Sequence, residues 1–173
     1  WDLEKGANKM SSNATYSRNE LLNDDVSIIE NKDTNSTDIL HEYFIPARNF
    51  LAYIEDMKEI LPSSGIDLLN ITIRRVEVDT VTFMNYARES VYGFVILFNQ
   101  KKTASQEKKM IALTRELVAA AIRREGTYYL PYRLHIDKHN MRQVYPQSDK
   151  FFELKRSYDP NEIFSNKFYE YYK

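Results

Sequence analysis

Two charged side chains are the strongest candidates for chemistry in this sequence: His135, and Arg74 at the end of Asn70-Ile71-Thr72-Ile73-Arg74. Arginine is always charged, so it can hold a substrate oxygen or stabilise negative charge that develops during a reaction. Histidine titrates close to neutral pH and can act as a general base. We predict both as catalytic residues. The simpler alternatives are a solvated Arg74 paired with Glu77 or Asp79, and a His135 that only packs.

An aromatic segment, Tyr128-Tyr129-Leu130-Pro131-Tyr132-Arg133, precedes His135. Tyrosine rings can form the walls of a ligand pocket, and an arginine can supply its cationic end. The segment reads equally well as a buried strand whose tyrosine hydroxyls find hydrogen-bond partners. We predict Tyr132 as a substrate-binding residue. Glu42, in an earlier apolar run, is a further substrate-binding candidate, with a structural ion pair as the alternative.

Composition narrows the classes of function. The chain has 173 residues, 43% of them apolar, which suffices for one domain with its own core. Its 24 basic and 25 acidic residues give a net charge of −1, which favours neither nucleic acid nor anionic lipid as a partner. No cysteine is present, so thiolate nucleophiles and zinc–thiolate sites are excluded, and we predict no metal site.

The apolar runs are too short for a membrane-spanning segment. We therefore expect a soluble protein, with the cytoplasm favoured and the compartment undetermined. Glycine is scarce, and the four glycines are widely separated: Gly6, Gly65, Gly93 and Gly126. A dinucleotide pyrophosphate needs close approach of a glycine-rich backbone. The chain is therefore not expected to hold a dinucleotide by itself.

Hydrophobic periodicity predicts an α+β domain. The expected elements, in order, are a strand over 39–45, a helix over 46–61, strands over 66–78 and 90–99, a helix that begins at the Thr103 and Gln106 capping box and ends before Gly126, and a short strand over 128–130. This order is typical of the ferredoxin-like split βαβ arrangement, an antiparallel sheet with its helices on one face. Asp159 is predicted to begin a helix in a C-terminal helical tail.

Two helices on one face leave the other face of the sheet free for water, another domain or a ligand. Within the predicted strand 66–78, Leu69, Ile71 and Ile73 alternate with polar residues. We expect these polar residues to project from the uncovered face, and we predict two of them, Asn70 and Thr72, as substrate-binding residues beside Arg74.

The chain resembles the C-terminal end of FAD-linked oxidoreductases of the vanillyl-alcohol-oxidase type. The resemblance rests on Glu42-Tyr43-Phe44-Ile45-Pro46, on Gly126 to His135, on Tyr145-Pro146, on Tyr158-Asp159-Pro160 and on Ile163-Phe164-Ser165-Asn166-Lys167-Phe168. It implies a cap domain whose sheet roofs a flavin, oxidation of a small polar alcohol or lactone by hydride transfer, and FAD bound mainly by a separate FAD-binding domain. It also implies that Arg133 and Asn166 lie at the cofactor.

On this basis we expect an irregular connector over 1–38, a cap domain over 39–132 and a tail over 133–173 that packs toward the FAD-binding domain. Two motifs depart from the lactone and alditol oxidase branch. Thr72-Ile73-Arg74 stands where that branch has Glu-x-Arg, and His135-Ile136-Asp137-Lys138 stands where it has His-Trp-Gly-Lys. The alternative function is a ferredoxin-like small-molecule sensor or dimerisation module without redox activity.

Overall fold

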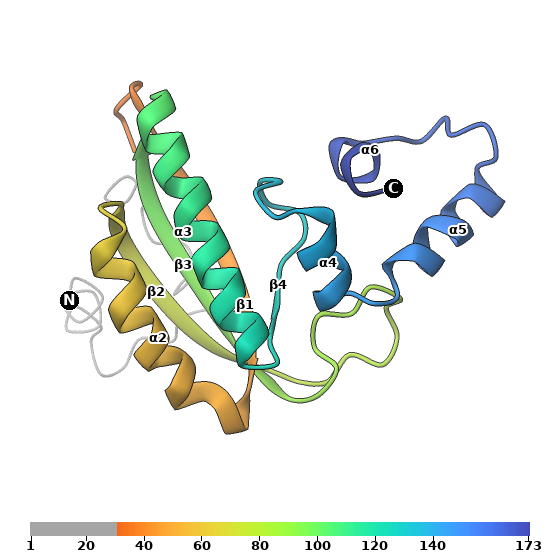
Figure 1. Ribbon diagram of the computed structural model, residues 1–173, viewed down its shortest axis with the longest axis horizontal. Coiled ribbons are helices and arrows are strands. Elements are labelled where there is room, and N and C mark those ends of the chain that lie inside the picture. Colours follow the sequence, from red (N-terminus) through yellow and green to blue (C-terminus); the bar gives the residue numbers. More distant parts are fainter. Residues whose placement is uncertain (1–30) are drawn as a thin grey trace, which may run out of the picture. The chain divides into compact units, whose positions relative to one another are not determined.

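Four antiparallel strands form the sheet: β1 (Ser36–Pro46), β2 (Asp67–Val76), β3 (Val91–Lys101) and β4 (Thr127–Tyr128). Their order across the sheet is β2-β3-β1-β4 (Figure 1). This computed structural model describes residues 31–173, of which 33–173 form one compact unit. Most of the predicted connector over 1–38 therefore lies outside the described residues. The predicted ferredoxin-like arrangement is confirmed.

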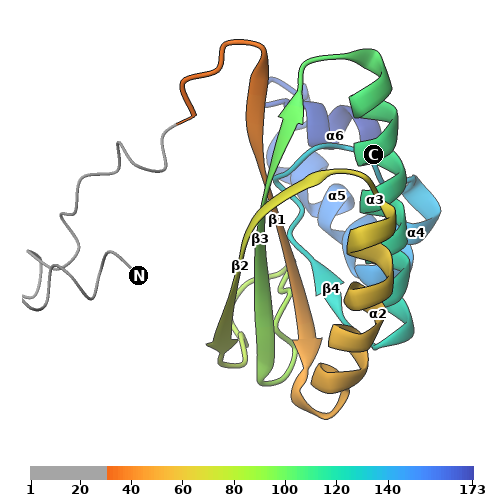
Figure 2. The ribbon, with the colours of Figure 1, turned by 90° about the vertical axis from the view of Figure 1, so that its left-hand side faces the viewer.

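The two long helices, α2 (Phe50–Ser63) and α3 (Ala104–Arg123), lie on the same side of the sheet (Figure 2). A 3-10 turn, η3 (Ala47–Asn49), leads into α2. The predicted cap of α3 is confirmed, because the Thr103 side chain accepts a hydrogen bond from the backbone N–H of Gln106. Three short helices follow β4: α4 (Lys138–Val144), α5 (Ser148–Tyr158) and α6 (Lys167–Tyr172).

The core lies between the sheet and the two long helices. Phe94, Ile96 and Phe98 alternate along β3 and are fully buried. They belong to one apolar cluster with Tyr53 of α2 and Leu117 of α3. Because strand side chains alternate between faces, these residues identify the covered face of the sheet.

Two local predictions need correction. Strand β4 has two residues, Thr127–Tyr128, instead of the predicted 128–130. Asp159 does not begin a helix: it caps the end of α5, and its carboxylate accepts the backbone N–H groups of Ile163 and Phe164. Glu162 has φ 49°, a left-handed conformation that a right-handed helix cannot include. The last helix therefore begins only at Lys167.

None of the helices in residues 31–173 is long and apolar enough to span a bilayer.

Candidate active site

The strand register identifies the residues of the uncovered face. Thr72 of β2 and Glu42 of β1 both lie opposite Val95 of β3, while Arg74 lies opposite Gly93. Directly opposed residues share a face, and their neighbours Ile71 and Ile73 lie opposite buried Ile96 and Phe94. Asn70, opposite Leu97, has the same orientation as Thr72. The structure thus places Asn70, Thr72 and Arg74 on the face that α2 and α3 leave uncovered, as predicted.

A glycine in the central strand lets side chains from the two flanking strands approach each other. Strand β3 lies between β2 and β1, and Gly93 lies between Arg74 and Phe44 in one cross-strand row. A Cβ atom at Gly93 would lie 3.3 Å from the ring of Phe44. The register places Arg74 opposite Gly93 and Glu42 opposite Val95, and the guanidinium of Arg74 lies 4.0 Å from a carboxylate oxygen of Glu42. The Arg74 side chain is 60% exposed and that of Glu42 only 17%.

Tyr132 completes this polar group. Its hydroxyl donates a hydrogen bond of 2.9 Å to Oε1 of Glu42, the same oxygen that faces Arg74. Burial, followed by the hydrogen bond and the negative charge of Glu42, raises the pKa of Tyr132 well above its ordinary value. The hydroxyl therefore stays protonated around neutral pH and remains a hydrogen-bond donor to Glu42.

Aromatic rings form one side of the same hollow. Phe44 stacks on Tyr86, with ring centroids 4.0 Å apart and planes at 19°. Tyr129 meets both rings edge-on and lies 5.4 Å from the ring of Tyr132. Phe44, Tyr86 and Tyr129 border an open pocket of about 470 Å³, together with Glu42, Arg74 and Gly93. A pocket with aromatic walls and a few polar groups can bind a small, hydroxyl-bearing molecule in a fixed orientation.

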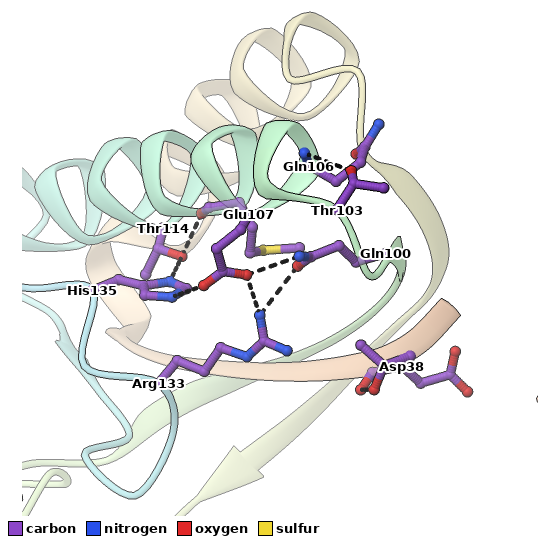
Figure 3. Close-up of polar contacts among 10 residues, drawn as sticks. Asp38, Gln100, Thr103, Gln106, Glu107, Thr114, Arg133 and His135 are labelled. Carbon is purple, nitrogen blue, oxygen red and sulfur yellow. Dashed lines mark hydrogen bonds and ion pairs between the residues drawn. The ribbon is translucent and has the colours of Figure 1, made fainter. Parts of the chain in front are cut away.

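His135 and Arg133 belong to a different group, beside α3 (Figure 3). One ring nitrogen of His135 lies 3.0 Å from Oε1 of Glu107, and the other lies 3.0 Å from the hydroxyl of Thr114. Arg133 donates to Oε2 of Glu107 and to Gln100. His135 is buried, and burial is the main reason that its pKa lies below the ordinary histidine value. The structure therefore does not bring the two predicted catalytic side chains, Arg74 and His135, together.

Asn166, the second predicted cofactor contact, caps α6. Its Oδ1 accepts the backbone N–H of Tyr169 at 2.9 Å. Its side chain borders a separate pocket with Phe164 and Phe168. The predicted site residues thus fall into three places: the uncovered face, the group around Glu107, and the start of α6.

A family model described as D-arabinono-1,4-lactone oxidase matches residues 2–172. The chain belongs to this family. The D-arabinono-1,4-lactone oxidase family model describes a C-terminal domain of FAD-linked oxidases of the vanillyl-alcohol-oxidase superfamily, which confirms the resemblance. The chain is therefore the C-terminal domain of an FAD-dependent oxidoreductase. No curated protein matches it.

Members of the D-arabinono-1,4-lactone oxidase family are flavoproteins, so the described residues can be tested for their fit to FAD. The three glycines in this part of the chain lie in different places: before β2, within β3 and after α3. They form no shared backbone cradle for a pyrophosphate. The aromatic rings and Arg74 of the uncovered face do suit the planar, reacting end of a flavin and its substrate. The residues of the uncovered face therefore suit the reacting end of FAD, and the described glycines offer no cradle for its phosphates.

Two residues that shape these sites, Gly93 and Glu107, were not among the candidates predicted from the sequence. Gly93 interrupts the apolar run of a buried strand. A glycine inside a strand often marks the close approach of another group, so the sequence did carry a signal for this position. Glu107 had no such signal, because a glutamate in the first turn of a helix is typical of helices in general.

Proposed function

We propose that the uncovered sheet face binds a small polar alcohol or lactone against the flavin of an FAD-dependent oxidoreductase, and that the donor loses hydride to the flavin there. The observation that carries this proposal is that the Arg74 guanidinium and the Tyr132 hydroxyl converge on one carboxylate oxygen, Oε1 of Glu42, beside the open pocket that Phe44 and Tyr86 border. These groups are aimed outward from a face that α2 and α3 do not cover.

Arg74 and Glu42 would share the work of holding the donor. The guanidinium of Arg74 is exposed, so its N–H groups can donate to a hydroxyl or carbonyl oxygen of the substrate. The Glu42 carboxylate can accept a hydrogen bond from a hydroxyl group of the substrate and so orient the substrate. The family branch with Glu-x-Arg carries its carboxylate on the same strand as the arginine, whereas here Thr72 occupies that position. We propose that Glu42 of β1 supplies the carboxylate instead.

The remaining predicted contacts have smaller roles. The Asn70 side chain donates a hydrogen bond of 3.1 Å to the Thr72 hydroxyl, and both are exposed at the edge of the site. FAD, bound mainly by a separate FAD-binding domain, would accept the hydride of the donor. Cofactor contact through Arg133 and Asn166 stays a prediction. So does catalysis by His135, although hydrogen bonds already engage both of its ring nitrogens.

The domain division stays part of the proposal. Residues 39–132 would be the cap and residues 133–173 the tail that packs toward the FAD-binding domain. Tyr132, at the end of the cap, would then join the two.

Two exposed arginines on opposite sides of the sheet offer a matched test in the flavin-loaded oxidase. Arg74 points to the uncovered face, whereas Arg123 lies in the last turn of α3, with its guanidinium 3.9 Å from Asp56. Arg74→Ala should lower the rate constant of flavin reduction by the donor about 100-fold, equivalent to about 3 kcal/mol. Arg123→Ala should change it by less than about twofold. Equal rates in the Arg74→Ala variant and the unaltered enzyme would reject Arg74 as a substrate-binding residue.

A further inference from the structure

The segment after β4 sends consecutive side chains to opposite sides of the chain. Tyr132 reaches Glu42 on the uncovered face, whereas Arg133 and His135 both reach Glu107 on α3. The segment is not a strand: residues 130–132 form a turn and a bend, and the backbone N–H of His135 donates to the carbonyl of Arg133 at 2.9 Å. Anything that fixes Arg133 and His135 therefore also fixes the backbone that carries Tyr132.

Glu107 is the common partner of this group (Figure 3). Its Oε1 faces Nε2 of His135 at 3.0 Å, and its Oε2 accepts from Arg133 and, at 2.8 Å, from Gln100. Helix α3 makes a second hydrogen bond to this segment, in which Nε of Arg115 donates to the backbone carbonyl of His135 at 3.2 Å. One carboxylate thus joins α3, β3 and the segment that follows β4.

The charge states of Glu107, Arg133 and His135 favour hydrogen bonds that persist at neutral pH. The Gln100 hydrogen bond is the largest cause that lowers the pKa of Glu107, with Arg133 and His135 adding to it. The carboxylate is therefore ionised at neutral pH and can only accept hydrogen bonds. Nε2 of His135 must then carry the proton that lies between the two groups. The side chain of Thr114, 3.0 Å from Nδ1, holds the other edge of the ring.

We infer that Glu107 is a positioning residue for the active site: by holding Arg133 and His135 on one side of the segment, it fixes the Tyr132 hydroxyl against Glu42 on the other. This inference rests on the proposed function only for what Tyr132 and Glu42 do. A purely structural role, in which Glu107 staples the segment to α3 without affecting Tyr132, makes a different prediction for the Tyr132 hydroxyl.

The first experiment follows the Tyr132 hydroxyl directly in this chain, without flavin or donor. Tyrosine labelled with ¹³C at Cζ reports ring ionisation by NMR, and the signal missing from Tyr132→Phe is that of Tyr132. Glu107→Gln keeps the size of the side chain and removes its charge. It should shift the Tyr132 signal toward the position of a tyrosine free of its Glu42 hydrogen bond. Glu116→Gln, at an exposed position of the same helix, should leave the signal unchanged.

A second variant covers the case in which Glu107→Gln fails to fold. Arg133→Gln removes one partner of Glu107 at a position with an exposed side chain, and it should move the Tyr132 signal in the same direction. An unchanged Tyr132 signal in the folded variant, with the His135 ring signals shifted, would overturn the inference and leave the proposed function standing.

The second experiment uses the flavin-loaded oxidase. Glu107→Gln should lower kcat about tenfold with little change in KM, and Glu107→Asp should restore part of the loss. Tyr132→Phe should give the same tenfold loss, and the double variant should be no worse than either single variant. If Tyr132→Phe leaves kcat unchanged while Glu107→Gln still moves the Tyr132 signal, Glu107 does position Tyr132 and the proposed role of Tyr132 in oxidation is wrong.

Discussion

The two faces of strand β3 differ in the burial and the polarity of the side chains around them. On the covered face, Phe94, Ile96 and Phe98 are fully buried among the side chains of α2 and α3. On the uncovered face the same strand presents Gly93 and Val95, flanked by Arg74 and Glu42 from its neighbours. The first face is packed along its length, whereas the second carries a small apolar cluster, in which Phe44 and Val91 pack with Ala87 and Tyr86, and an open pocket beside it. Stability is thus concentrated on one side and binding capacity on the other.

The neighbouring residues His41 and Glu42 on β1 show the same difference between the two faces of the sheet. His41 lies on the covered face opposite Ile96, and burial lowers its pKa to about 4, with the positive charges near it adding to the effect. It is therefore neutral at pH 7, and its Nδ1 lies 3.0 Å from the hydroxyl of Tyr43. Glu42, one residue later, faces the other way and is paired with Arg74 and Tyr132. Adjacent residues thus have opposite electrostatic environments because the strand alternates.

The largest expected effect is on the stability of the covered face. Phe94→Ala should lower the free energy of unfolding by about 3–5 kcal/mol, because it removes a fully buried aromatic ring and leaves a cavity. Its neighbour Val95 is half-buried on the other face, and Val95→Ala should cost about 1 kcal/mol or less. Urea unfolding followed by circular dichroism measures both. Equal losses would mean that the uncovered face is as important for folding as the core.

The next effect is the pH dependence that His41 imposes. The pKa of His41 is depressed from 6.5 to about 4 in the folded chain, so the unfolded chain binds the extra proton first. Stability should be full above pH 6.5 and fall by about 3 kcal/mol as the pH drops to 4. His41→Gln should remove that part of the loss, whereas the exposed control His139→Gln should not. His135, whose pKa burial also lowers, keeps its own contribution in both variants.

The smallest effect separates binding from stability on the uncovered face. Gly93→Ala is compatible with the strand, since Gly93 has no positive φ, and should change the free energy of unfolding by less than about 1 kcal/mol. The added Cβ would lie 3.3 Å from the ring of Phe44, in the lining of the open pocket, and would narrow that pocket. Donor affinity should therefore fall about tenfold, equivalent to about 1.4 kcal/mol. A variant that binds the donor normally would show that the hollow is not used.

Much of the fold was predictable because local signals and global order agree. Alternating residues in β2 predicted the face of Arg74, and the Thr103 and Gln106 pair predicted the start of α3. The order of strands and helices predicted the split βαβ arrangement, since few sheets fit that order. The failure at Asp159 is also local, because the positive φ of Glu162 is not visible in the residue types of Asp159-Pro160-Asn161-Glu162.

The composition of the site was only partly predictable. Arg74, Glu42 and Tyr132 were each identified as candidates, but their meeting depends on β3 lying between β2 and β1 and on the course of the chain after β4. The three residues come from segments far apart in the sequence. His135 was grouped with Arg74 by residue type alone. The structure places it beside Glu107 instead, because the chain after β4 turns there and directs His135 to α3 and Tyr132 to Glu42.

The most direct measurement of the central claim is a crystal structure of the flavin-loaded oxidase with a donor or product bound. We predict that polar atoms of the bound molecule lie within hydrogen-bond distance of both Arg74 and Glu42, above Gly93, with its carbon skeleton against Phe44 and Tyr86. A molecule bound beside Glu107 and His135, or anywhere with Arg74 and Glu42 still exposed to solvent, would contradict the account.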